Sequence, residues 1–126
     1  MIERNYGRII NIASIGSFLA LYEVAAYSAS KSALASVTKS LAVEWAKYNI
    51  CVNAIAPGYF RTPLNEKLIV GTERGREIIM RTPMNRFGDL KELVGAAIFL
   101  ASDAASFVTG VILPVDGGVL ASGVNR

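Results

Sequence analysis

Three side chains in the first third of the chain are of the types that assist hydride transfer at a carbonyl. Tyr27 and Lys31 lie four residues apart in the sequence YSASK, and Ser14 precedes Tyr27 by thirteen positions. A phenol alone is too weak an acid to exchange protons readily at neutral pH, but a nearby ammonium favours the phenolate. Tyr27 is therefore a candidate proton donor and acceptor, and Ser14 is a candidate hydrogen-bond partner of the same substrate oxygen.

A strand and a helix must position these groups. Residues 8–14 (RIINIAS) are apolar on both faces and predict a buried strand that ends at Ser14. Tyr27 and Lys31 open a predicted helix over residues 27–48 and share one of its faces, since four residues make about one turn. The predicted apolar stripe of this helix consists of Ala33, Leu34, Val37, Leu41, Ala42 and Trp45.

The rest of the chain predicts an α/β fold with a three-stranded parallel sheet. Residues 50–56 and 111–115 are further strands, and residues 90–101 form a helix between them. Asp89 is a good N-cap for that helix, and Glu92 follows it with capping-box spacing. Glycine and proline interrupt residues 59–88, which predict only short helical pieces.

Composition excludes several classes of function. The chain has no histidine, which excludes a Ser-His-Asp triad, and no metal site is predicted. Its net charge of +3 comes from scattered basic residues, so no nucleic-acid partner is predicted. No apolar run is long enough to cross a bilayer, and the start lacks a secretory pattern. The single cysteine, Cys51, predicts a buried hydrophobic residue and a reducing, cytoplasmic location.

The Tyr-x-x-x-Lys spacing is weak evidence by itself. Of the five tyrosines, only Tyr27 has a lysine four residues on, and only Tyr27 also follows a strand-end serine and opens a long helix. This combination favours catalysis. Ser17 is an alternative to Ser14, whereas the other nearby serines are interpreted as helix-surface residues: Ser28, Ser30 and Ser32.

The chain resembles the C-terminal half of a short-chain dehydrogenase/reductase. The matching pieces are GRIINIAS at 7–14, YSASK at 27–31, VNAIAPG at 52–58 and DGG at 116–118. PGYFRT at 57–62 and RFGD at 86–89 also resemble the gluconate and glucose dehydrogenases of this family. The resemblance implies a truncated Rossmann-like sheet of three C-terminal strands with flanking helices, so that residues 1–126 are a single partial domain without the N-terminal half.

The resemblance also implies a role for each matching residue. Tyr27 would donate and accept the proton, Lys31 would favour its phenolate and hydrogen-bond the nicotinamide ribose, and Ser14 would orient the substrate oxygen. The other cofactor-binding residues would be Pro57, Gly58, Phe60 and Thr62. Residues 59–88 would form a substrate lid, with three candidate pocket walls: Tyr22, Tyr59 and Met84.

Structural alternatives stay open for several of these residues. Pro57-Gly58 is also a common strand-ending turn, and Thr62 before a proline is also a helix cap. Ordinary packing is an alternative for the three candidate pocket walls. Asn53 is interpreted as structural, with its side chain bonding nearby backbone.

Part of the family's pattern is absent. No G-x-G-x-x-G spacing occurs among the eleven glycines, and neither does the Asn-Asn-Ala-Gly segment or the residue that chooses NAD or NADP. NAD or NADP is implied for the full-length family, whereas the chain alone is expected to be inactive and to bind little or no cofactor. Met1–Tyr6 resembles the tail of a preceding helix, so the start is expected to lie inside a longer protein.

Two hypotheses follow from the sequence. In the first, the chain belongs to an NAD(P)-dependent oxidoreductase acting on a small secondary alcohol or ketone such as a sugar, polyol or sugar acid. In the second, it is a non-catalytic fragment that acts only as an oligomerisation module. The exposed edge of strand 8–14 and the uncovered face of the long helix predict a homo-oligomer.

Overall fold

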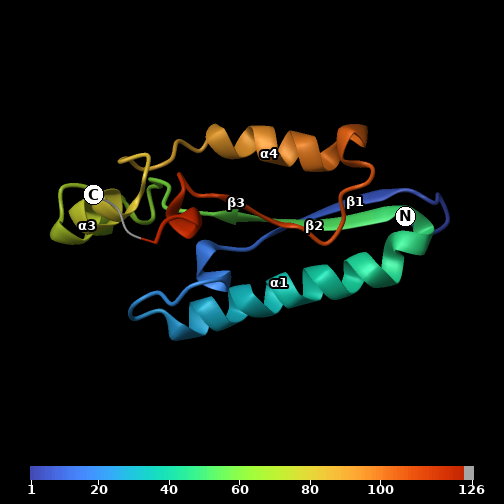
Figure 1. The fold of residues 1–126 in the computed structure, drawn as a ribbon, viewed down its shortest axis with the longest axis horizontal. Helices are drawn as coiled ribbons and strands as arrows, with labels where there is room; N and C mark the ends of the chain where they lie inside the picture. Colours follow the sequence, from blue (N-terminus) through green and yellow to red (C-terminus); the bar gives the residue numbers. More distant parts are fainter. Residues whose placement is uncertain (124–126) are drawn as a thin grey trace.

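The structure is a computed structural model that describes residues 1–123, and its centre is a parallel sheet (Figure 1). The strands are β1 (Gly7–Ile12), β2 (Ile50–Pro57) and β3 (Ile112–Val115). They lie side by side in the order β1-β2-β3, with Gly7 opposite Ile50 and Ala54 opposite Ile112. This arrangement confirms the predicted Rossmann-like α/β class.

Helices cover both faces and one end of the sheet. Figure 1 shows α1 (Ala25–Trp45) on one face and α4 (Glu92–Ala101) on the other. Two short helices, α2 (Glu66–Ile69) and α3 (Glu73–Arg81), follow β2, and α3 lies beyond the carboxyl ends of the strands. No helix of residues 1–123 is both long and apolar enough to cross a membrane. Single turns of 3-10 helix occur at Ile15–Ser17, Ala46–Tyr48, Asp103–Ala105 and Val119–Ala121.

Small side chains allow α1 to lie close to the sheet. Ala35 of α1 belongs to a buried cluster with Ala54 and Ala56 of β2. Further along, Ala42 packs in the same way with Val52. Side chains alternate along a strand, so these even-numbered residues of β2 face α1 while the odd-numbered ones face α4.

The buried stripe of α1 differs from the predicted one. Ala33 and Val37 are exposed, so their assignment to the stripe is wrong, and Ala35 and Thr38 are buried instead. Thr38 is tolerated inside because its hydroxyl donates to a carbonyl one turn back at 2.8 Å and accepts from Asn11 Nδ2 at 2.9 Å. Thr38 is missing from the predicted stripe because an apolar pattern does not include threonine, even where hydrogen bonds inside the protein satisfy the threonine hydroxyl.

On the opposite face, a buried asparagine ties β2 to the loop before β3. Asn53 is 1% exposed; its Nδ2 donates to Val108 O at 2.8 Å, and its Oδ1 accepts from Val111 N at 3.0 Å. The structural interpretation of Asn53 is therefore confirmed. Cys51 lies on the same face and is buried, as predicted.

The outer edge of β1 has no partner strand among the described residues. Gly7 and Ala13 direct their N–H groups to β2 or to the residue before it. Because hydrogen-bonding direction alternates along a parallel strand, the even-numbered residues between them face outward. The outward backbone groups belong to Arg8, Ile10 and Ile12.

Candidate active site

The segments that leave the three strands all begin at the carboxyl end of the sheet, called the strand-end edge below, because the strands are parallel. Ser14 follows β1, Gly58 follows β2 and Asp116 follows β3. Gly58 N donates to Val115 O at 2.9 Å, and a Cβ placed on Gly58 would lie 2.6 Å from Asp116 Cα. Glycine is thus required here for the ends of β2 and β3 to approach each other.

Ser14 is held at the start of a 3-10 turn. Its backbone is extended, its side chain is 6% exposed, and its Oγ accepts from Gly16 N at 3.0 Å. The hydroxyl hydrogen has no acceptor among the described residues. The rival Ser17 instead donates its hydroxyl to Lys31 O at 2.8 Å, which fastens the turn to α1. Of the two serines, Ser14 is the one with a donor available to a ligand.

Tyr27 and Lys31 lie in the first turns of α1, which begins two residues earlier than predicted. Lys31 Nζ is 5.7 Å from the centroid of the Tyr27 ring, within range of a cation–π contact. It also donates to Ile12 O at 2.7 Å, on the outward side of β1. Tyr27 is 47% exposed, and its hydroxyl has no hydrogen-bond partner in residues 1–123. The predicted pairing of phenol and ammonium on one helix face is present.

The turn after β1 packs against this part of α1. A Cβ on Gly16 would lie 3.4 Å from Ser14 Oγ and 3.3 Å from Ser28 Oγ, so the two hydroxyls flank the same glycine. The interpretation of Ser28 as a surface residue is wrong, because its Oγ is buried and has no partner among the described residues. No hydrogen bond joins Ser14 to Tyr27 in this part of the chain; catalytic hydrogen bonds often tighten only when substrate binds.

The two ends of the segment 59–88 are hydrogen-bonded to each other. Phe60 and Gly88 form a parallel bridge, and Gly88 N donates to Tyr59 O at 2.9 Å. Asn65 fixes the next turn: its Oδ1 accepts from Thr62 N and its Nδ2 donates to Phe60 O, both at 2.9 Å. The N-cap of α2 is Asn65, so the helix-cap alternative for Thr62 is wrong. Within residues 1–123 the Thr62 hydroxyl has no partner.

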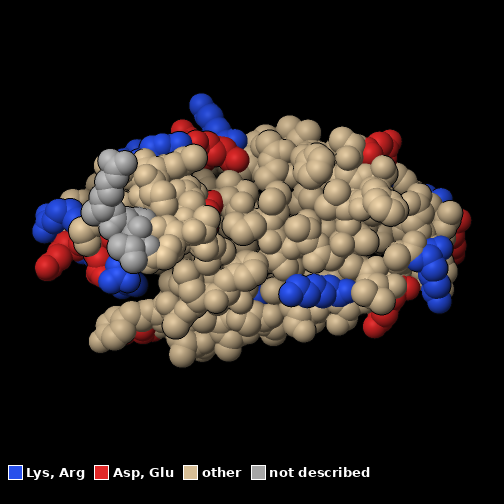
Figure 2. Space-filling model, in the orientation of Figure 1, with Lys and Arg blue, Asp and Glu red and all other residues tan. Residues whose placement is uncertain are grey.

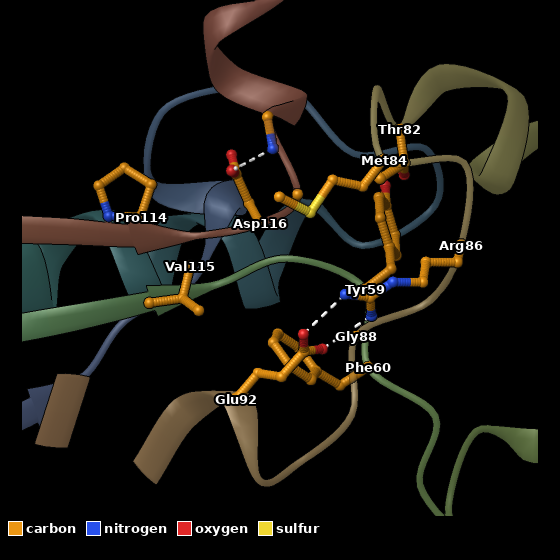
Figure 3. A pocket seen from close by; sticks show the side chains of 12 residues that line it. Tyr59, Phe60, Thr82, Met84, Arg86, Gly88, Glu92, Pro114, Val115 and Asp116 are labelled. Atoms are coloured by element: carbon orange, nitrogen blue, oxygen red, sulfur yellow. Dashed lines mark hydrogen bonds and ion pairs between the residues drawn. The ribbon is translucent and has the colours of Figure 1, made fainter. Parts of the chain in front are cut away.

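A cavity of about 300 Å³ opens between this segment, β3 and the start of α4 (Figure 3). Tyr59 and Met84 line it, in line with their prediction as pocket walls, whereas Tyr22 is 82% exposed and lines no part of it. In Figure 3, Pro114 and Val115 face Tyr59 and Met84 across the cavity. The full lining is Tyr59, Phe60, Thr82, Met84, Arg86, Gly88, Glu92 and residues 114–118.

An ion pair joins the end of this segment to α4 (Figure 3). Arg86 Nη1 and Nη2 donate to Glu92 Oε2 and Oε1 at 2.8 and 2.6 Å, and Asp89 N also donates to Oε2 at 2.8 Å. The hydrogen bond from Arg86 is the main cause that lowers the pKa of Glu92 to about 2, followed by the backbone bond. The capping-box spacing predicted the Asp89–Glu92 contact, but no local pattern indicated Arg86. The predicted N-cap at Asp89 is wrong, because α4 begins at Glu92 with Lys91 as its N-cap, and Asp89 Oδ1 instead accepts from Lys91 N at 3.0 Å.

We expect the Arg86–Glu92 pair to persist far into the acid range. A lowered carboxyl pKa stabilises the folded chain above the ordinary value of 4.5, and this contribution is lost as the pH falls toward about 2. A carbon-detected NMR titration should place the Glu92 midpoint near 2, and Arg86→Gln should raise it toward 4.5. A Glu92 midpoint near 4.5 in the unmodified chain would contradict the pairing.

Comparison with known proteins identifies the family. A family model described as "Enoyl-(Acyl carrier protein) reductase" matches residues 1–120. The chain belongs to the short-chain dehydrogenase/reductase family. It is 45% identical over 122 residues to gluconate 5-dehydrogenase of Gluconobacter oxydans, covering 97% of this chain and 48% of that protein. It is 49% identical over 123 residues to 2-dehydro-3-deoxy-D-gluconate 5-dehydrogenase of Formosa agariphila, covering 97% and 47%.

A solved structure of the same family supports the fold. The crystal structure of a gluconate 5-dehydrogenase from Burkholderia cenocepacia, in complex with NADP and tartrate, matches with a TM-score of 0.93 and 46% identity. The match covers 96% of this chain and 48% of that one. This short-chain dehydrogenase/reductase chain thus spans about half the length of the curated relatives it matches. The predicted resemblance to gluconate dehydrogenases is confirmed.

The donors at the strand-end edge fit the nicotinamide end of NAD(P), the cofactor of this short-chain dehydrogenase/reductase family. Tyr27, Ser14 and Thr62 keep unpaired hydroxyls among the described residues, and Lys31 uses only one N–H group, toward Ile12. These groups suit an uncharged amide and ribose hydroxyls. The sequence contains no glycine-rich turn for the pyrophosphate, so only the nicotinamide end has matching groups in this chain.

Proposed function

We propose that this chain is the catalytic part of an NAD(P)-dependent oxidoreductase that interconverts a secondary alcohol and a ketone on a sugar acid, sugar or polyol. The observation that carries the proposal is the placement of Ser14 after β1 and of Tyr27 and Lys31 in the first turns of α1, which packs against that turn. Each of the three side chains keeps at least one hydrogen-bond donor without a partner among the described residues. The names of the relatives, which act on gluconate-type acids, support this choice of substrate.

Each of the three residues has one task in the oxidation direction. Tyr27, as the phenolate, accepts the proton of the substrate hydroxyl. Lys31 stabilises that phenolate, and Ser14 donates a hydrogen bond to the oxygen as it becomes a carbonyl. The hydride that leaves the carbon bearing this oxygen would pass to NAD(P)⁺, which would supply the acceptor when bound, so the alcohol loses one hydride and one proton in all.

The cofactor and substrate contacts form a second part of the proposal. Pro57 and Gly58 would hold the nicotinamide, and the Phe60 backbone and the Thr62 hydroxyl would bind its carboxamide. The closed base of the segment 59–88 supports its role as a substrate lid that moves as a unit. A cytoplasmic setting also belongs to the proposal, and the buried Cys51 thiol suits a reducing compartment.

A second candidate function is assembly with further copies of the chain. The outer edge of β1 is unpaired, and Ile12 at its end is 54% exposed. Both covering helices also expose apolar side chains: Val37 and Val43 of α1, and Val94, Ile98 and Phe99 of α4. Uncovered apolar surface of this kind favours a homo-oligomer, with or without catalysis.

A combined assay separates the two functions. The purified chain is mixed with D-gluconate and either NAD⁺ or NADP⁺, and reduced cofactor is followed at 340 nm, while sedimentation velocity reports its oligomeric state. Cofactor reduction that depends on gluconate supports the oxidoreductase. An oligomer without any reduction supports the assembly module, and a monomer across a wide concentration range contradicts it. Cofactor reduction that is equal with and without gluconate contradicts the oxidoreductase proposal.

A further inference from the structure

The turn after β1 and the helix α1 carry the two halves of the candidate active site. Ser14 opens that turn, whereas Tyr27 and Lys31 lie in α1. Figure 1 shows the turn, in blue, beside the first part of α1. No hydrogen bond joins the Ser14 and Tyr27 side chains among the described residues. Other residues must therefore fix the separation between the two halves.

Ser17 is hydrogen-bonded to both halves. Its backbone N–H donates to Ser14 O at 2.9 Å, and its hydroxyl donates to Lys31 O at 2.8 Å. A carbonyl oxygen has two lone pairs, so Lys31 O can accept this bond beside a helical one. Within the part of the chain that the structure describes, it is the only hydrogen bond from residues 14–17 to α1. One residue thus links the backbones of two of the three residues to which the chemistry is assigned.

Lys31 is held at a second point by the same segment of the chain. Its Nζ donates to Ile12 O at 2.7 Å, at the end of β1. Ile12 precedes Ser14 and Ser17 follows it, so Lys31 contacts the segment on both sides of the serine. Neither contact uses the Ser14 side chain, whose Oγ accepts from Gly16 N and keeps its hydrogen available. The arrangement therefore fixes the backbone around Ser14 and leaves its hydroxyl free for a ligand.

Ion pairs do not contribute to this connection. None of the ion pairs in residues 1–123 involves a residue of the turn or of α1. Figure 2 likewise shows charged side chains mainly around the edge of the face that it draws, while the middle is largely uncharged. Close packing assists the hydrogen bond, because a Cβ on Gly16 would lie 3.1 Å from Leu21 Cδ1 and 3.3 Å from Ser28 Oγ. Displacement of the turn is therefore opposed by the Ser17 hydroxyl and by this packing.

We propose that Ser17 is a positioning residue, which holds the Ser14 hydroxyl and the Tyr27–Lys31 pair at the separation that hydride transfer requires. This inference rests on the proposed function and adds a residue to it. The Ser17 hydroxyl has no free donor for a ligand, because its hydrogen is bonded to Lys31 O. Catalytic groups must be held within about 0.5 Å of the productive geometry, and a misplacement of about 1 Å can lower the rate about 10²-fold. Loss of the Ser17 bond should therefore affect the rate more than ligand binding.

Amide hydrogen exchange in the 126-residue chain tests how the turn is held, and it needs no turnover. The Gly16 and Ser17 amides are the reporters, because they donate to Ser14 Oγ and to Ser14 O. Ser17→Ala should lower the protection factors of these two amides about three- to tenfold, the factor that corresponds to one hydrogen bond. Ser17→Thr keeps a hydroxyl and should restore them. The Ala54 amide, which donates to Val111 O in the sheet, should keep its protection in both variants.

Ser30→Ala is the matched control. It removes the same kind of bond from the same helix, that of Ser30 Oγ to Tyr27 O at 2.7 Å, but this bond stays within α1. The protection factors of the Gly16 and Ser17 amides should then change less than about twofold. No loss of protection in Ser17→Ala, or an equal loss in Ser30→Ala, would overturn the inference. An equal loss at the Ala54 amide would also overturn it, because it would indicate a lower global stability instead of a freed turn.

Kinetics test the same inference in any preparation of the chain that oxidises gluconate. Ser17→Ala should lower kcat by about tenfold or more while KM changes less than about twofold, because Ser17 contacts no ligand. Ser17→Thr should recover most of kcat. An unchanged kcat in Ser17→Ala, or a rise in KM alone, would contradict a positioning role. If the proposed function fails, the unmodified chain reduces no cofactor, and the exchange experiment still decides whether Ser17 holds the turn against α1.

Discussion

Replacing Tyr27 by phenylalanine lowers NAD(P)-dependent oxidation by a factor of about 10²–10⁴ if Tyr27 is the proton acceptor, the usual size of general acid–base catalysis. The change removes one oxygen that bonds nothing in residues 1–123, from a side chain that is 47% exposed. The free energy of unfolding should therefore change by less than about 0.5 kcal/mol. Steady-state kcat/KM and a urea denaturation curve check both expectations, in any preparation of the chain that shows turnover.

Tyr22→Phe is the control for this experiment. It makes the same chemical change five residues earlier, at a side chain that is 82% exposed and has no lysine one turn on. Its activity should equal that of the unmodified chain. Full activity in Tyr27→Phe would remove Tyr27 from the mechanism, and a large loss of stability in that variant would show that its hydroxyl has a structural role.

Asn53→Ala should be the most destabilising of the substitutions considered, by about 3 kcal/mol. Two part-buried backbone groups, Val108 O and Val111 N, would lose the partner that the buried Asn53 amide supplies, and each unsatisfied buried group costs about 1–3 kcal/mol. The total free energy of unfolding of a small domain is only about 5–15 kcal/mol, so the urea concentration at the midpoint of unfolding should fall markedly. Urea denaturation followed by circular dichroism measures this loss.

Asn11→Ala provides a graded comparison. Asn11 is half-buried and its amide makes one side-chain hydrogen bond, to Thr38 Oγ1 at 2.9 Å, while Thr38 keeps its own bond to Leu34 O. The expected loss is about 1 kcal/mol, the net value of one hydrogen bond. If Asn53→Ala costs no more than Asn11→Ala, the amide of Asn53 does not anchor the loop before β3.

Sequence patterns located most elements because apolar runs were bounded by glycine and proline. β2 was placed to within one residue, since Pro57-Gly58 marks its end. β1 stops at Ile12 rather than Ser14, because Ser14 turns to cap the following 3-10 helix. α1 begins at Ala25, where no side chain caps the helix, so no local signal marked its start.

The candidate site was predictable only where neighbours in sequence are also neighbours in space. The pairing of Tyr27 with Lys31 follows from helical spacing alone. The bond from Lys31 to Ile12 O joins residues nineteen positions apart, and the cavity combines three separate segments, so neither has a local signature. The burial of the Ser28 hydroxyl likewise depends on how the turn around Gly16 folds back on α1.

The bridge between Phe60 and Gly88 makes the intervening segment an exchangeable module. Its two ends are already joined, so insertions between them add little closure entropy; doubling a flexible loop costs only about 0.6 kcal/mol. Residues that distinguish one ligand from another can therefore vary in that segment while the sheet, with its tightly packed alanines, stays the same. Because of this division, ligand preference can change, in evolution or by protein engineering, without any change in the residues to which the chemistry is assigned.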